Sequence, residues 1–303
     1  MSRLAALLLV ARAGARRGAG TSAAALHPDL YFRQVRAGDQ IALDASELSA
    51  FARQMNNFMY LVGDRRTGDC VVVDGCRAPD ELAALAAADN MTLRAAIATH
   101  YHWDHIGGAV DLGRRGGAGK VVVPGLAELL APPHGLPAHV PHWERDAAAA
   151  QIGVAPDALL PLADHQCMAV GGFGLEFLHT PGHSPGSMCI RVSAGLRGAA
   201  NATDGAANAT DDAADVTDDD GPEDVLLITG DTVFPGSCGR LDLPGSDARV
   251  MYDSLQRLAA LPESLVIFPG HGYNGASSTI GAEKRTGLLR PMSREQWDRS
   301  MVR

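Results

Sequence analysis

Short apolar runs recur along the chain, and turn-rich or helical segments separate them. The runs Phe58–Val62 and Cys70–Asp74 flank the turn-rich segment Gly63–Gly68, a pattern that predicts a β-hairpin. The Ala- and Leu-rich stretch Pro79–Asp89 has acidic residues near its start, as a helix does. The next apolar run, Leu93–Thr99, has the length and composition of a buried strand.

The second half of the chain continues this alternation of strands and helices. Further strands are predicted over Lys120–Val123, Leu175–Leu178, Met188–Val192, Val225–Thr229 and Leu265–Phe268. Further helices are predicted over Leu126–Leu130, Asp146–Gln151 and Asp247–Ala260. The region Pro132–Trp143, rich in Pro and His, is expected to be an irregular surface loop. Many strands with interspersed helices predict an α/β layered architecture.

The first 28 residues differ in composition from the rest. They contain four arginines and many alanines, and no acidic residue precedes Asp29. This composition predicts an organelle transit peptide, mitochondrial in its simplest interpretation and plastid as an alternative. The short apolar run Leu4–Val10 leaves a secretory signal or a disordered tail as other interpretations. Residues 29–303 are then expected to form the folded domain.

A low-complexity segment, residues 194–224, lies between two predicted strands. It holds nine acidic residues, one arginine and a repeated Asn-Ala-Thr, and it carries −8 of the formal net charge of −9. Such a segment cannot bury enough apolar surface to fold, so we expect a disordered loop on a single domain.

The remaining composition limits the classes of partner. Nowhere does a basic stripe of the kind that follows a phosphate backbone occur, so nucleic acid is not an expected partner. No run reaches the roughly 18 apolar residues that a membrane span needs. Five scattered cysteines without a C-x-x-C pair indicate free thiols in a reducing compartment.

The segment Thr99–Gly108, with the sequence THYHWDHIGG, follows a predicted buried strand directly. Residues two apart stay on the same side of a segment leaving a strand, so His100, His102 and Asp104 can converge. His105 then faces a neighbouring point. Imidazole and carboxylate groups suit zinc, iron or manganese, and the absence of a nearby cysteine argues against a structural zinc site.

Three later segments share one pattern, an apolar strand that ends near a glycine and one ligand-type residue. They are Leu178–Ser184 with His183, Leu227–Thr232 with Asp231, and Ile267–Gly272 with His271. Strands that end together place the loops that follow them at one rim of a sheet, where sites usually form. These three residues can therefore join the first cluster.

Taken together, these motifs resemble those of the metallo-β-lactamase fold, most closely of its glyoxalase II (hydroxyacylglutathione hydrolase) branch. The resemblance covers most of residues 55–290 and fills all seven ligand positions. It implies an α/β fold, the αββα four-layer sandwich, and two divalent metal ions, with zinc expected and iron or manganese as alternatives. The implied ligands are His100, His102 and His183 for metal one, Asp104, His105 and His271 for metal two, and Asp231 as the bridge.

Two divalent metals about 3.5–4 Å apart lower the pKa of a shared water from about 15.7 toward neutrality. A hydroxide nucleophile is then available without a serine or cysteine. Asp104 is the candidate catalytic residue, because it is expected to orient this hydroxide as well as to bind metal two. Glyoxalase II-like proteins commonly read His-x-His-Trp-Asp-His, and Trp103 fits that pattern. The resemblance therefore implies hydrolysis of a thioester, hydroxyacylglutathione (such as S-lactoylglutathione) or a related acyl-thiol.

Candidate substrate contacts lie nearer the C-terminus. Glyoxalase II proteins hold glutathione with a basic residue and a Tyr two positions later; Arg240 matches the base, but Asp242 stands where the Tyr would be. The stretch Ser278–Arg290 resembles the close of short glyoxalase II-like proteins and supplies Lys284 and Arg290 as candidate anion contacts. Solvated charges on a terminal helix are the alternative interpretation for both.

The other histidines are expected to have no part in metal binding. His134, His139 and His142 lie in the Pro-rich loop, where we expect solvated or locally bonded side chains. His179 is expected to lie behind the ligands or in the core.

A second function in the same superfamily fits part of the sequence. The persulfide dioxygenase branch is mitochondrial, ends in similar Cys-Gly-Arg and Ser-Thr-x-x-x-Glu segments, and binds one Fe(II), here through His100, His183 and Asp231. Trp103 favours the hydrolase over this branch. A lactonase or β-lactamase also fits the ligands. A nuclease lacks its basic surface here, and a non-catalytic binding protein is expected to have lost ligands.

Overall fold

A computed structural model describes residues 26–41, 53–111, 120–195 and 223–302. The predicted transit peptide, residues 1–28, falls almost entirely outside this part, as does most of the predicted acidic loop 194–224. Two ends of that loop are described, and they correct its boundaries. Ala194 ends one strand and Glu223 begins the next, because the pairing of these two strands continues into the acidic segment.

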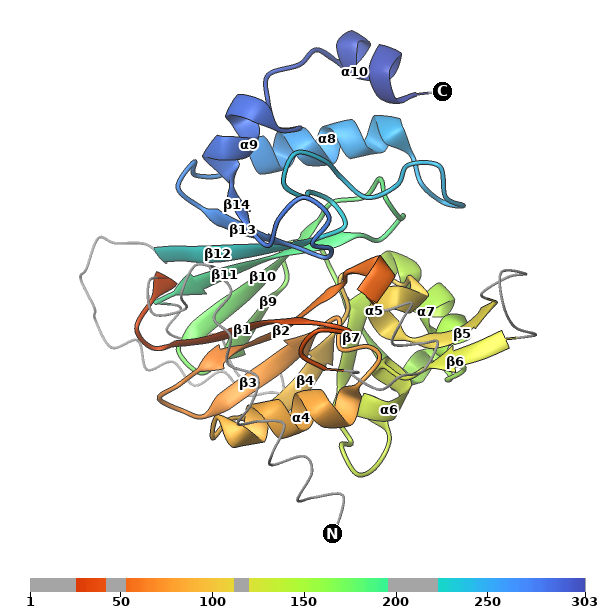
Figure 1. The fold of residues 1–303 in the computed structure, drawn as a ribbon, viewed down its shortest axis with the longest axis vertical. Coiled ribbons are helices and arrows are strands. Elements are labelled where there is room, and N and C mark those ends of the chain that lie inside the picture. The colour runs from red at the N-terminus through yellow and green to blue at the C-terminus, as the bar shows by residue number, and fades with distance from the viewer. Residues whose placement is uncertain (1–25, 42–52, 112–119, 196–222, 303) are drawn as a thin grey trace, which may run out of the picture.

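Two six-stranded β-sheets lie face to face (Figure 1). In spatial order, the first contains β1 (Leu30–Arg36), β2 (Phe58–Asp64), β3 (Asp69–Val73), β4 (Thr92–Ile97), β7 (Ala138–Pro141) and β8 (Leu159–Leu162). The second contains β14 (Ser278–Thr279), β13 (Val266–Pro269), β12 (Glu223–Gly230), β11 (Met188–Ala194), β10 (Phe173–His179) and β9 (Cys167–Val170).

Helices cover the outer face of each sheet (Figure 1). The first sheet carries α4 (Pro79–Ala88), α6 (Leu126–Leu130) and α7 (Arg145–Ile152). The second carries α8 (Ala248–Ala259), α9 (Ile280–Thr286) and α10 (Arg294–Met301). Shorter pieces are α5 (Trp103–Ile106), the ribbon β5 (Gly108–Asp111) and β6 (Lys120–Val123), and the 3-10 turns η1 (His142–Glu144) and η2 (Pro156–Ala158).

Three separate hydrophobic cores divide these elements into four layers. One core lies between α4, α6, α7 and the first sheet, one between the two sheets, and one between the second sheet and α8, α9, α10. Along β2, Tyr60 points into the core between the sheets, while Met59 and Leu61 point toward the helices. Because successive side chains of a strand face opposite ways, a strand buried on both faces has a continuous apolar sequence. The predicted αββα sandwich is confirmed.

The prediction of an irregular surface loop over Pro132–Trp143 is wrong in its second half. Ala138–Pro141 forms β7, which pairs in parallel with β4 and is buried along its whole length. Prolines and a histidine hide this strand from a hydropathy pattern. His139 is accordingly 7% exposed, where a solvated or locally bonded side chain was expected. The strands β1, β8, β9 and β14 and the helix α10 also had no prediction.

Strand directions bring several chain segments to one end of the sandwich. The strands β10, β12 and β13 run the same way, since β10 and β12 both pair antiparallel with β11 and β12 pairs in parallel with β13. In the other sheet, β3 runs parallel to β4. The backbone N–H of Met188 donates to the carbonyl of Thr99 (2.9 Å), which joins the sheets at this end. None of the described helices has the length and apolar character that crossing a membrane requires.

Phe177 tests the core between the sheets, because its side chain is fully buried there. Phe177→Ala is expected to lower the free energy of unfolding by about 3–5 kcal/mol, since it removes a large apolar group and leaves a cavity. The measurement is urea unfolding followed by circular dichroism. Leu160→Ala, at a position that is 41% exposed on the edge strand β8, is the control and should cost less than about 0.5 kcal/mol. Equal effects of both changes would contradict this assignment of the core.

Candidate metal centre

Four chain segments meet at the end of the sandwich where β4, β10, β12 and β13 finish. The loop after β4 carries His100 and His102 and continues into the single turn α5, and the loop after β10 carries His183. Each of these imidazole rings is within 5 Å of the other two, measured between ring centroids. Asp231 follows β12 and His271 follows β13, so one rim of the molecule collects the predicted residues.

Asp74, at the end of β3, holds the loop that carries the first motif. Its carboxylate accepts three hydrogen bonds, from the backbone N–H of Thr99 (2.7 Å), the Thr99 hydroxyl (2.8 Å) and His105 Nδ1 (2.9 Å). Asp74 is 1% exposed, so these bonds form in a medium that strengthens them. The carboxylate only accepts, so His105 carries a proton on Nδ1 and turns Nε2 toward the site.

Three other histidines are oriented in the same way. The Nδ1 atom of His183 lies 2.9 Å from the carbonyl oxygen of Arg240, and that of His271 lies 2.6 Å from the carbonyl oxygen of Met55. The Nδ1 atom of His100 lies 3.2 Å from the Thr99 hydroxyl, whose own hydrogen goes to Asp74. Since carbonyl oxygens only accept, Nδ1 carries a proton in the rings of His183 and His271, and Nε2 is the nitrogen that faces the site.

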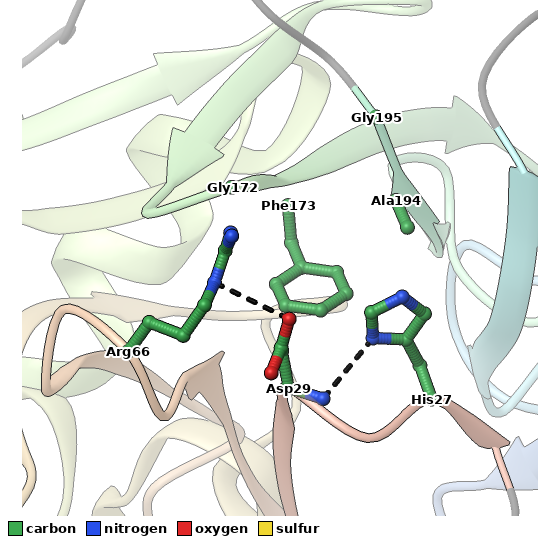
Figure 2. A pocket seen from close by; sticks show the side chains of 7 residues that line it. All are labelled: His27, Asp29, Arg66, Gly172, Phe173, Ala194 and Gly195. Carbon is green, nitrogen blue, oxygen red and sulfur yellow. Dashed lines mark hydrogen bonds and ion pairs between the residues drawn. The ribbon is translucent and has the colours of Figure 1, made fainter.

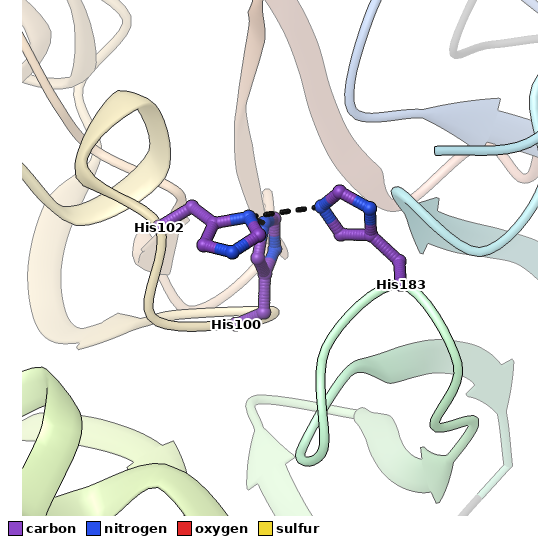
Figure 3. Close-up of side chains that lie close together, drawn as sticks. All are labelled: His100, His102 and His183. Carbon is purple, nitrogen blue, oxygen red and sulfur yellow. Dashed lines mark hydrogen bonds between the residues drawn. The ribbon is translucent and has the colours of Figure 1, made fainter. Parts of the chain in front are cut away.

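The ring nitrogens of His100, His102 and His183 point toward one another (Figure 3). His102 Nδ1 lies 3.0 Å from His100 Nε2 and 2.9 Å from His183 Nε2. One proton on His102 satisfies only one of its neighbours, so the three nitrogens repel one another unless they share a cation. Burial lowers the pKa of His100 well below its ordinary value and that of His102 to about 4, which keeps both rings neutral. Neutral imidazole is the form that binds metal.

Carboxylates and two histidines form a second cluster beside the first. His271 Nε2 lies 3.4 Å from Asp104 Oδ2 and 3.3 Å from His105 Nε2. Burial opposes a charge on His105, but Asp231, Asp74 and Asp104 outweigh it and raise its pKa to about 10, so without a cation this ring holds a second proton on Nε2, which a metal ion would displace. This cluster therefore attracts positive charge.

Asp231 reaches both clusters. Its Oδ2 atom lies 3.4 Å from His183 Nε2 and 3.3 Å from His271 Nε2, and its Oδ1 atom lies 3.4 Å from His105 Nε2. Burial alone would raise the pKa of Asp231, but His271 and His105 hold it well below its ordinary value, so the group is charged. Oδ1 is buried and has no hydrogen-bond partner, although a buried acceptor normally has one.

The donor set fits two divalent cations. Neutral imidazole nitrogens and carboxylate oxygens are the ligands that zinc, iron and manganese take in hydrolytic sites. Three groups of side chains bring their ligand atoms within 4.8 Å of one another. They are His100, His102 and His183; His100, His105 and Asp231; and Asp104, His105 and His271. A cation in each cluster would relieve the repulsion between lone pairs and give Asp231 Oδ1 a partner.

Two glycines leave room for the ligands. A Cβ atom at Gly270 would lie 2.4 Å from Asp231 Oδ1, and one at Gly239 would lie 2.6 Å from His183 Nδ1. Any other residue would displace a ligand at either position.

Two residues that sequence reasoning missed fix the orientation of Asp104. The Asn57 amide nitrogen donates to Asp104 Oδ2 (3.2 Å), and Arg77 donates to the Asn57 amide oxygen (2.9 Å). A guanidinium has no acceptor, so Arg77 sets which way round the Asn57 amide lies. Asp74 stands at a strand end like the predicted ligands and could have been found by that pattern. No comparable signal marks Asn57 or Arg77.

The predicted substrate contacts lie apart from the ligand cluster or are already paired. Arg240 makes a two-pronged bond to Asp242 (2.8 and 2.9 Å) and touches His183 only through its carbonyl. Lys284 pairs with Glu263 (3.0 Å). Arg290 is exposed. The structure thus brings together all seven predicted metal ligands, and it pairs the cationic groups of Arg240 and Lys284 with carboxylates outside that set.

A half-open cleft of about 220 Å³ lies far from this centre, at the start of β10 (Figure 2). Phe173, His27 and Asp29 line it together with Arg66. The Arg66 guanidinium lies 3.4 Å from Asp29 and 3.1 Å from Asp64, so its charge is compensated. His179, at the other end of the same strand, precedes the loop that carries His183. The ligand cluster therefore remains the candidate site.

Comparison with known proteins adds independent information. The family model described as the metallo-beta-lactamase superfamily matches residues 53–195 and 219–271. A metallo-beta-lactamase from Staphylococcus aureus subsp. aureus COL has a similar fold, with a TM-score of 0.64 at 21% identity over 90% of this chain and 67% of that chain. At this identity the likeness concerns the fold alone.

Proteins of similar sequence include the following three relatives. An uncharacterized protein of Mycobacterium tuberculosis is 30% identical over 75% of this chain and 89% of its own length. The hydroxyacylglutathione hydrolase of Aeromonas salmonicida is 30% identical over 72% of this chain and 62% of its own length. The probable polyketide biosynthesis zinc-dependent hydrolase BaeB of Bacillus velezensis is 25% identical over 76% of this chain and 79% of its own length.

Metal binding should stabilise the folded protein, because the ligand atoms converge on one site only after the chain has folded. Zinc added to the metal-stripped protein at 100 times its dissociation constant is expected to raise the free energy of unfolding by about 2.7 kcal/mol per site. Thermal denaturation with and without zinc measures this gain. His183→Ala should lose part of the gain, whereas the control His134→Ala should keep it, since His134 bonds to Asp80 at the surface. A melting temperature that zinc leaves unchanged would contradict the assignment of the centre.

Proposed function

The chain belongs to the metallo-beta-lactamase superfamily, and on that premise we propose that it is a two-zinc hydrolase that cleaves a thioester. Hydroxyacylglutathione, such as S-lactoylglutathione, is the first substrate to test, and related acyl-thiols follow. The observation that carries the proposal is the convergence of five imidazole rings and two charged carboxylates at one buried rim. A structural histidine cluster has no need to aim its lone pairs at one another.

Bound zinc would supply Lewis acidity and a hydroxide nucleophile at neutral pH. His100, His102 and His183 would hold one ion, Asp104, His105 and His271 the other, and Asp231 both. The chain itself keeps His100 and His102 neutral, keeps the Asp104 and Asp231 carboxylates charged, and fixes the directions of these side chains. Asp104 can also accept a proton from the attacking water, since Asn57 engages only its Oδ2 atom among the described residues and so leaves Oδ1 to the reaction.

Support for a thioester comes from the first motif and from the relatives. Trp103 completes the His-x-His-Trp-Asp-His pattern, and a relative at 30% identity is described as a hydroxyacylglutathione hydrolase. Binding of the thiol carrier is expected to differ from that in glyoxalase II, because Asp242, which stands where the Tyr would be, pairs with Arg240. We therefore propose a wider panel of carriers than glutathione alone.

Asp231→Asn tests the proposal directly. The change keeps the shape of the side chain but removes the charge that both clusters share, so kcat/KM for the best thioester should fall about 1,000-fold, or ~4 kcal/mol. The assay follows free thiol release from S-lactoylglutathione and from coenzyme A and N-acetylcysteamine thioesters. Asp242→Asn is the matched control at an exposed carboxylate, and its turnover of the thioesters without glutathione should stay near the wild-type rate. Full turnover by metal-free Asp231→Asn protein would overturn the mechanism.

A mononuclear-iron persulfide dioxygenase is the alternative, and the same purified protein decides between the two. The hydrolase predicts two metals per chain and thiol release without oxygen. The dioxygenase predicts one iron per chain and oxygen uptake with glutathione persulfide. Metal analysis of the purified protein together with an oxygen electrode separates these outcomes. One iron per chain with oxygen consumption would contradict the proposed hydrolase.

A further inference from the structure

Glu144 lies buried between the two loops that carry the first cluster of histidines. It is 2% exposed and ends the turn η1, directly before α7. The residue stands at the N-cap of α7, a position where an acidic side chain usually accepts a hydrogen bond from the first helical turn. Here its side chain makes no such bond. The carboxylate points away from the helix into the protein.

Each carboxylate oxygen of Glu144 accepts a backbone N–H from a different loop. Oε2 accepts from Tyr101 (3.0 Å), which stands between the ligands His100 and His102. Oε1 accepts from Gly186 (2.7 Å), three residues after the ligand His183. The Ser184 hydroxyl provides a further hydrogen bond. One side chain therefore connects the two segments that supply all three histidines of the first cluster.

Burying this carboxylate is costly, because no cation accompanies it among the described residues. Burial raises the pKa of Glu144, and its hydrogen bonds oppose that rise. A neutral apolar residue would avoid the cost but would leave two backbone N–H groups without acceptors. The space around the group is also closed, since a Cβ atom at Gly186 would lie 2.5 Å from the Glu144 Cγ atom.

The neighbouring residue braces the same loop at a second point. Trp143 stacks flat on His179, with ring centroids 3.6 Å apart and planes within 2°. His179 Nε2 in turn lies 2.9 Å from the carbonyl oxygen of Pro185. The turn η1 thus holds the 183–187 loop both through Glu144 at Gly186 and through Trp143 and His179 at Pro185.

We propose that Glu144 is a positioning residue that ties the His100/His102 loop to the His183 loop and thereby sets the metal affinity of the first cluster. This inference rests on the proposed two-zinc function. The second cluster takes Asp104 and His105 from the near loop and His271 from a segment that Glu144 does not touch. Loss of the tie therefore affects the first metal more than the second.

The experiment compares Glu144→Gln with the wild-type protein. A glutamine has one acceptor oxygen, so one of the two backbone N–H groups would face an NH2 group instead. Zinc affinity of the three-histidine site, measured by competition with a chromophoric chelator, is expected to fall about 10–100-fold, the range found when groups behind metal ligands are removed. At chelator concentrations where the wild type keeps two zinc ions, the variant should keep one. Absorption bands of cobalt bound to the three-histidine site should shift or disappear.

Glu283→Gln is the matched control, because Glu283 is also a buried glutamate that accepts a backbone N–H, from Gly236 (2.9 Å), and a hydroxyl, from Ser278 (2.6 Å). It should lower the melting temperature but leave both zinc affinities and the cobalt spectrum unchanged. An equal loss of zinc affinity in the control would mean general destabilisation and would overturn the proposal.

If circular dichroism shows that the Glu144→Gln protein is unfolded, Glu144→Asp takes its place. The aspartate keeps the charge, but its side chain is one methylene shorter, so it can accept from only one of the two loops. That variant should lose affinity at the first site several-fold. Wild-type affinity and an unchanged cobalt spectrum in a folded Glu144 variant overturn the inference alone. A wild-type protein that binds no zinc overturns the proposed function, and the inference with it.

Discussion

Repulsion between converging imidazole lone pairs is the constraint around which one end of this molecule is built. His100, His102 and His183 come from two different sheets, yet their ligand nitrogens lie 2.9–3.0 Å apart. Nothing in the polypeptide relieves this crowding, so the fold must hold the rings together until a cation does. The four-layer sandwich provides the necessary rigidity, because three separate cores fix the strands whose ends carry the ligands.

Orientation is the work of residues that do not face the metal. Asp74 holds His105 and Thr99, backbone carbonyls hold His183 and His271, and Asn57 with Arg77 holds Asp104. The Asp74 carboxylate and the backbone carbonyl oxygens only accept hydrogen bonds, and the Arg77 guanidinium only donates them. These partners therefore fix the place of a proton as well as the position of a side chain. The site is therefore specified by hydrogen-bond polarity as much as by distance, which is the usual role of groups behind metal ligands.

The candidate substrate contacts differ from the candidate metal ligands in their surroundings. Arg240 and Lys284 pair with Asp242 and Glu263, so an anionic substrate would compete with these carboxylates for the two cations. Most of the candidate metal ligands are buried and oriented by fixed hydrogen-bond partners, whereas the candidate substrate cations lie on exposed or partly exposed side chains. The buried ligand set therefore restricts the reaction class, whereas the exposed cations leave room for several thiol carriers.

Sequence by itself determined the layered class and pointed to the seven candidate metal ligands that the structure brings together. The ligands are local signals: each follows an apolar strand within a few residues, and strand ends in one sheet meet at one rim. The αββα architecture follows from strands whose two faces are both apolar, as in β2. The sequence pattern failed for β7, where Pro and His break the hydropathy signal although the strand is buried. Only the tertiary structure decided the partners of the ligands, because Asn57, Arg77 and Glu144 act on groups 20 to 47 residues away. Hydrogen-bond partners at such separations leave no periodicity in the chain, and they become visible only when the two sheets meet.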